Sequence, residues 1–148
     1  MKGVKQQGFS LVEILVVLVI IGLLISIVAP SVLNRADDAR IKKVQADIKS
    51  ISTALKLYRL DNFEMPTTEQ GLDALRVKPS LAPVPKNWKE GGYLDEMPAD
   101  PWGRPYLYLS PAEFGDGEFD LYSLGADGVR GGDGQKADIG NWQDGAES

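Results

Sequence analysis

Residues 8–33 read GFSLVEILVVLVIIGLLISIVAPSVL, an apolar stretch with one charged side chain, Glu13. The run from Ile14 to Leu33 holds roughly 20 uncharged residues, which at about 1.5 Å per residue matches a bilayer core of about 30 Å. A charged side chain at the bilayer centre costs about 2.5 to 3.5 kcal/mol, so we expect Glu13 to lie near an edge or to meet a cation. The stretch predicts a transmembrane helix with a functional acid near its start.

The segment before this stretch is short, polar and basic. Lys2 and Lys5 are its charged residues, and by the positive-inside rule they keep the N-terminus in the cytoplasm while the rest of the chain is exported. A secretory signal peptide cleaved near Ala29 is the alternative. The apolar run is long for a signal peptide, no clean A-x-A site follows it, and Glu13 fits badly inside it.

The residues around Gly8 resemble the type IV prepilin leader. In KGVKQQGFSLVE, the residues Gly8, Phe9 and Glu13 match that motif position by position. The resemblance implies that a prepilin peptidase cuts after Gly8 and that Phe9 becomes N-methylphenylalanine. It also implies that Glu13 pairs with the N-terminal amine of a neighbouring subunit during assembly, which would neutralise a buried carboxylate. The expected organisation is a leader at 1–8, a transmembrane and assembly helix at 9–33, and a periplasmic globular domain at 34–148.

The composition of the chain excludes several classes of function. The 148 residues carry a net charge of -5, with no cysteine and no histidine. A protein that binds nucleic acid needs a basic face, so we expect no such partner. The usual nucleophile and base pairs of enzymes are missing, so we expect no catalysis. An exported domain without disulfides needs another constraint on its loops, for which a metal ion is the natural candidate.

The pattern after Pro30 predicts an α+β domain. Apolar residues recur at steps of three and four along a helix that ends near Asp61, at Ile41, Val44, Ile48, Ile51, Leu55 and Tyr58. A coiled coil is the alternative, but it would need a longer heptad repeat. Pro30 allows a kink or local unwinding between Gly22 and Pro30. A short helix capped by Thr67 or Thr68 is expected at 68–76. Alternating residues predict antiparallel strands at 105–109 and 118–123, and a third near 137–142.

Motifs in the middle of the chain resemble the major pseudopilin family of the type II secretion system, also called the general secretion pathway protein G family. They are MPTTEQGL at 65–72, Asn87-Trp88, GYL at 92–94 and DPWGRPY at 100–106. The resemblance implies a type IV pilin-like fold, in which a long N-terminal helix packs on a small antiparallel sheet. Trp88, Trp102 and Tyr106 are then expected to close a small core, and an aromatic binding cleft is the alternative.

The same resemblance implies a structural role in protein export. The chain would be a single-pass protein of the bacterial inner membrane that polymerises in the periplasm and drives folded proteins across the outer membrane. The implied partners are further copies of itself, minor pseudopilins, the prepilin peptidase, the inner-membrane assembly platform and membrane lipid. A type IV pilin, a minor pseudopilin and a calcium-stabilised periplasmic enzyme with a secretory signal remain as alternatives.

The tail from Ser123 to Trp142 is rich in glycine and aspartate. Its carboxylates Asp127, Asp133 and Asp138 could converge as hard oxygen ligands for calcium, although the spacing is not that of an EF-hand. A solvated Asp/Gly turn is the alternative. The pseudopilin resemblance implies a calcium ion held by aspartate side chains and backbone carbonyls. It points to Asp127 and the Leu124 carbonyl first, with Asp133 and Asp138 as further candidate ligands.

Overall fold

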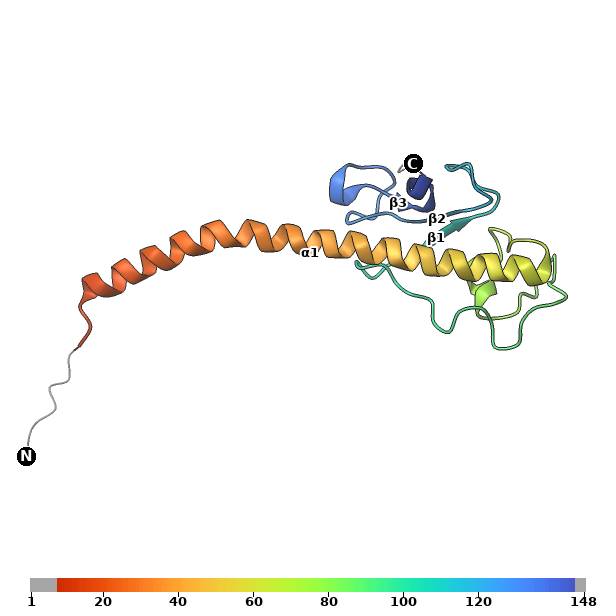
Figure 1. Ribbon diagram of the computed structural model, residues 1–148, viewed down its shortest axis with the longest axis horizontal. Helices are drawn as coiled ribbons and strands as arrows, with labels where there is room; N and C mark the ends of the chain where they lie inside the picture. The colour runs from red at the N-terminus through yellow and green to blue at the C-terminus, as the bar shows by residue number, and fades with distance from the viewer. Residues whose placement is uncertain (1–7, 146–148) are drawn as a thin grey trace, which may run out of the picture. The chain divides into compact units, whose positions relative to one another are not determined.

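The computed structural model describes residues 8–145, and their side chains except those of residues 27–34, 135, 144 and 145 (Figure 1). The elements in chain order are α1 (Leu11–Asn62), η1 (Leu72–Leu75), β1 (Leu107–Leu109), β2 (Asp120–Ser123), η2 (Gly134–Lys136), β3 (Ile139–Gly140) and η3 (Asn141–Gly145), where η is a 3₁₀ helix. The chain divides into two compact units, Met1–Asp38 and Ala39–Ser148.

Helix α1 ends at Asn62, one residue beyond the predicted end. Its secondary structure stays helical from Gly22 to Pro30, so the local unwinding expected there does not occur. Pro30 removes only one backbone donor from a helix of 52 residues.

The core of the second unit forms where α1 meets the C-terminal sheet and the connecting segments. The stripe of apolar residues predicted on the helix is confirmed, since Val44, Ile51 and Leu55 are fully buried and Ile41 packs at the edge. The other members of the core are Ile48, Ala54, Tyr58, Leu72, Ala74, Leu75, Tyr106, Tyr108, Phe119, Leu121 and Ile139. The apolar repeat in the sequence therefore predicted correctly which face of α1 is buried.

The sheet is antiparallel, with strand order β1-β2-β3. Tyr108 lies opposite Leu121, and Tyr122 lies opposite Gly140. All three predicted strands are present but shorter than expected. In the loop before β2, the N–H groups of residues 113–115 donate to the buried Asp120 carboxylate at 2.6 to 3.1 Å. Those bonds fold the loop back against the first residue of β2.

The helix predicted at 68–76 is confirmed only in part. Residues 68–71 form a turn, and only the short η1 follows. Gly71 has φ of +61°, a left-handed conformation that interrupts an α-helix. The expected cap is present at Thr67, whose Oγ1 accepts the N–H of Gln70 while the Gln70 side chain accepts the N–H of Thr67, both at 3.1 Å.

The aromatic residues of the middle segment pack as the sequence predicts. Tyr106 is buried in the core, and Trp88 and Trp102 are partly buried against it. The Trp88 indole donates to the Ala74 carbonyl at 2.9 Å. Asp100 and Gly103 close a turn through a bond from the Gly103 N–H to the Asp100 carbonyl at 2.9 Å. These aromatic side chains contribute to the core of the second unit.

Candidate functional site

The N-terminal site residues lie at the start of α1. Gly8 and Phe9 precede the helix, and Phe9 is 79% exposed. Glu13 is exposed in the first helical turn, where a carboxylate is favoured by the helix dipole. Ser10 caps this helix through its Oγ, which accepts the Val12 N–H at 3.3 Å. The sequence analysis missed this cap, although a serine before an apolar helical run is its usual signal. Residues 1–7 of the expected leader lie outside the described residues.

The described side chains from Phe9 to Ser26 are all exposed. Most are large and apolar, with exposed fractions from 46% at Ile21 to 79% at Phe9. Among the residues whose side chains the structure describes, which in this stretch end at Ser26, no helix combines the length and the mean hydropathy that a membrane crossing requires.

The glycine-rich loop after β2 contains the expected metal ligands. Asp127 is exposed, and its Oδ1 accepts the Val129 N–H at 3.0 Å. Asp138 lies just before β3, and its Oδ2 accepts the Gly131 N–H at 3.0 Å. Asp133 is exposed, and its carbonyl accepts the Lys136 N–H at 3.2 Å. The carboxylates of Asp127 and Asp138 therefore brace two separate parts of the loop.

One observation in this loop suits a cation, and another limits how it could bind. The Oδ1 atom of Asp138 is buried and accepts no hydrogen bond among the described residues, which leaves an acceptor without compensation for its burial. No group of three acidic side chains in the described part of the chain comes close enough to share a metal ion. The structure therefore does not gather Asp127, Asp133 and Asp138 into one group, and the buried Oδ1 of Asp138 is the atom of this loop that suits a cation.

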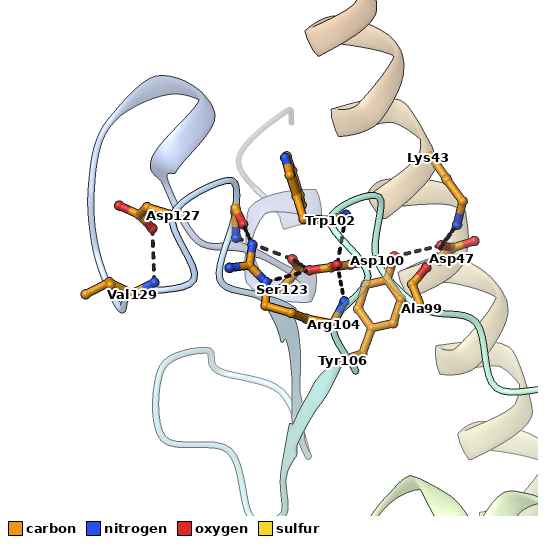
Figure 2. Close-up of polar contacts among 11 residues, drawn as sticks. Lys43, Asp47, Ala99, Asp100, Trp102, Arg104, Tyr106, Ser123, Asp127 and Val129 are labelled. Carbon is orange, nitrogen blue, oxygen red and sulfur yellow. Dashed lines mark hydrogen bonds and ion pairs between the residues drawn. The ribbon is translucent and has the colours of Figure 1, made fainter.

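A buried polar network, which sequence analysis did not identify, lies beside this loop (Figure 2). Asp100 is 4% exposed, and its Oδ1 accepts the N–H groups of Trp102 at 3.0 Å and Arg104 at 2.8 Å. Its Oδ2 accepts the Ser123 hydroxyl at 2.7 Å and lies 3.7 Å from Arg104 Nε. The Asp-Pro-x-Gly turn was the available signal, since an aspartate there often accepts N–H groups of its own turn.

The same turn is tied to α1 by a second polar contact (Figure 2). The Tyr106 hydroxyl donates to Asp47 Oδ2 at 2.7 Å, and Lys43 donates both to that carboxylate and to the Ala99 carbonyl. Burial, followed by the hydrogen bond and the charge of Asp47, raises the pKa of Tyr106. The tyrosine therefore stays a neutral donor, and its contact with Asp47 fixes the turn against the helix.

Comparisons with known proteins cover most of this chain. A profile of the family described as "Type II secretion system (T2SS), protein G" matches residues 31–142, and the "Prokaryotic N-terminal methylation motif" matches residues 4–29. The type II secretion system core protein G of Pseudomonas aeruginosa is 54% identical over 93% of this chain and 96% of its own length. The corresponding protein of Vibrio cholerae is 50% identical over 93% of this chain and 92% of its own.

A solved structure agrees with the fold. The crystal structure of the major pseudopilin from the type 2 secretion system of enterohaemorrhagic Escherichia coli is 41% identical, covers 75% of this chain and 93% of its own, and has a TM-score of 0.66. Together with the packing of α1 on the small antiparallel sheet, these matches decide between the filament families that the sequence left open. The chain belongs to the protein G family, the major pseudopilins of the type II secretion system.

Proposed function

We propose that this chain is a structural subunit that polymerises into the pseudopilus, a periplasmic filament that drives folded proteins across the outer membrane. The observation that carries the proposal is the exposure of the apolar side chains between Phe9 and Ser26. An apolar surface of this extent requires lipid or other protein to cover it. A subunit that is stored in a membrane and later joins a filament uses both environments in turn.

The proposed location follows from the sequence of the first unit. The uncharged run from Ile14 to Leu33 is long enough to cross the inner membrane once. Lys2 and Lys5 favour a cytoplasmic N-terminus, which leaves the unit Ala39–Ser148 in the periplasm. Further copies of the chain, minor pseudopilins and the inner-membrane assembly platform are the proposed partners.

Assembly is proposed to depend on Gly8, Phe9 and Glu13. A match to the N-terminal methylation motif over residues 4–29 supports cleavage after Gly8 by a prepilin peptidase and methylation of Phe9. Cleavage creates an amine at Phe9. The Glu13 carboxylate of a neighbouring subunit would neutralise that amine once both are removed from water, and an unpaired charge would be expensive there.

Calcium is proposed to stabilise the loop between β2 and β3. The buried, unpartnered Oδ1 of Asp138 supports this proposal. The exposed Asp127 carboxylate accepts the Val129 N–H through Oδ1, and its second oxygen takes no part in that bond. Asp127, Asp138 and the Leu124 carbonyl are the proposed ligands, and Asp133 is a further candidate on the same loop. The bound ion would supply the constraint that disulfides give to other exported domains.

The assembly proposal is tested with Glu13→Ala in a bacterium that has a type II secretion system. We expect the variant to enter the membrane and to carry N-methylphenylalanine at Phe9 by mass spectrometry, while the yield of sedimented filaments falls at least about 100-fold. Glu69→Ala is the matched control, because Glu69 is an exposed acid of the second unit. Wild-type filament yield from Glu13→Ala would contradict the pairing. A mature chain that starts near Ser31 would remove the filament proposal altogether.

A further inference from the structure

The buried Asp100 carboxylate holds two side chains that both reach Gly125. The Ser123 hydroxyl donates to Asp100 Oδ2 and accepts the Gly125 N–H at 3.3 Å. The Arg104 guanidinium lies 3.7 Å from the same carboxylate through Nε and donates through Nη2 to the Gly125 carbonyl. The N–H and the carbonyl of Gly125 are thus bound by Ser123 and Arg104, which Figure 2 shows beside the Asp100 carboxylate that holds them both.

The guanidinium also lies against the next turn of the loop. Gly128 has φ of +70°, and a Cβ built at this position would overlap Arg104 Nη1. The Trp102 ring lies on another side of the guanidinium, 5.9 Å from Cζ to the ring centroid. Gly125 itself is buried with φ of +64°. The segment from Gly125 to Gly128 therefore folds around a cation that belongs to a different part of the chain.

We propose that Arg104 is a positioning residue of the calcium loop, which shapes residues 125–128 so that the Leu124 carbonyl and the Asp127 carboxylate are in place before the ion binds. The proposal rests on the calcium site of the proposed function. A loop that is ordered in advance loses less conformational entropy when it binds its ligand, and its affinity is higher for that reason. Asp100 offsets the positive charge of Arg104, which would otherwise repel the ion.

The first test replaces the planar guanidinium of Arg104 but keeps its positive charge. Arg104→Lys retains a cation and cannot donate from several nitrogens in the same fixed geometry. In the full chain in detergent micelles with chelator present, we expect the Gly125 and Val129 amides to exchange with deuterium about tenfold faster by NMR. Calcium affinity measured by titration calorimetry should fall about tenfold, and the amides of β2 should keep their protection.

The second test approaches the same contact from the loop. Gly128→Ala places a methyl group where the guanidinium lies, whereas Gly131→Ala introduces a residue at φ of +94° with no atom within 4 Å of its Cβ. Both variants carry the strain of a left-handed residue, so Gly131→Ala is the matched control. We expect Gly128→Ala alone to weaken calcium binding. The double variant with Arg104→Lys should bind calcium about as weakly as Arg104→Lys alone. Gly131→Ala and Arg104→Lys should act additively.

The outcomes separate this proposal from the calcium site itself. Unchanged exchange at Gly125 and Val129 in Arg104→Lys would overturn the role of Arg104, whatever the calcium result. Faster exchange with unchanged calcium affinity would also overturn it, because the loop would then not need to be shaped in advance. If the wild type binds no calcium, the proposed site fails, and faster exchange in chelator still supports Arg104 as the residue that shapes the loop.

Discussion

Tyr108 is a single residue whose ionisation should be visible in the stability of the fold. Its hydroxyl is buried and donates to the Pro66 carbonyl at 2.8 Å. Burial raises the pKa of Tyr108 to about 12, whereas the pKa in an unfolded chain is about 10. The folded state therefore holds this proton more tightly, so the stabilisation is complete below pH 10 and is lost as the pH rises through the folded pKa.

We expect this tyrosine to contribute about 1.4 kcal/mol less to the free energy of unfolding at pH 11 than at pH 8. Urea unfolding of the wild type and of Tyr108→Phe at both pH values measures the difference. At pH 8, Tyr108→Phe should have a free energy of unfolding about 1 kcal/mol below that of the wild type, because it lacks the hydrogen bond. Between pH 8 and pH 11, its free energy of unfolding should fall by less than that of the wild type. An identical pH dependence of the free energy of unfolding in the two proteins would show that folding does not raise the pKa of Tyr108.

The aspartates of the tail allow a second prediction at the scale of the residue. Asp127→Asn and Asp138→Asn each keep an oxygen for the loop N–H that the aspartate now binds, and each removes a charge that calcium needs. With calcium at about 100 times its Kd, the wild type should gain about 2.7 kcal/mol. Its thermal midpoint should then rise by about 5 to 10 °C over that in chelator.

Both asparagine variants should show a much smaller rise in thermal midpoint, with midpoints near that of the wild type in chelator. Asp116→Asn is the control, because Asp116 is exposed in the loop before β2 and should respond to calcium as the wild type does. A full calcium response in Asp138→Asn would remove this residue from the proposed ligands.

At the scale of the element, the sequence predicted what depends on local pattern. The repeat from Ile41 to Tyr58 placed the buried face of α1 because a helix with one apolar stripe has one way to bury it. The helix predicted at 68–76 forms only in part because Gly71 has a left-handed backbone conformation. The helix-forming residues around Gly71 do not predict that conformation. The bonds from the N–H groups of residues 113–115 to Asp120 were missed because no periodicity reveals a contact between a loop and a side chain of the strand that follows.

The buried stripe of α1 makes a direct prediction about stability. Leu55 is fully buried, while Leu57, two residues along the same helix, is 47% exposed. Leu55→Ala should lower the free energy of unfolding by about 2 to 5 kcal/mol, because it removes buried methyl groups and leaves a cavity. Leu57→Ala should change it by less than about 1 kcal/mol. Denaturant unfolding of the two variants measures both values, and equal losses would contradict the assigned orientation of the helix.

At the scale of the whole molecule, the candidate sites were predictable to different degrees. Gly8, Phe9 and Glu13 lie in one short segment, so they could be proposed as site residues from the sequence alone. The network around Asp100 joins Arg104, in the turn before β1, to Ser123, the last residue of β2, and the two meet only in the folded chain. The sequence pattern around Arg104 indicated no role for its side chain. Its contact with Gly125 depends on the register of β1 and β2, which local sequence patterns do not determine.

The division of the chain into two units predicts that the second can fold without the first. Every residue of the hydrophobic core described here lies between Val44 and Ile139, inside the unit Ala39–Ser148. A fragment of residues 35–148 should therefore unfold cooperatively, with a thermal midpoint within about 3 °C of the full chain, since a domain with its own core is stable alone. Calorimetry of the fragment in buffer and of the full chain in micelles makes the comparison.

The same fragment separates folding from assembly. It lacks the exposed apolar side chains of residues 9–26 and the Glu13 carboxylate, so it should stay monomeric in sedimentation velocity without detergent and should form no filaments. Leu55→Ala in the fragment should lower stability by the same amount as in the full chain, because the cavity lies in the core that the two share. A fragment that assembles into filaments would place the polymer contacts in the second unit and leave the apolar helix with anchoring alone.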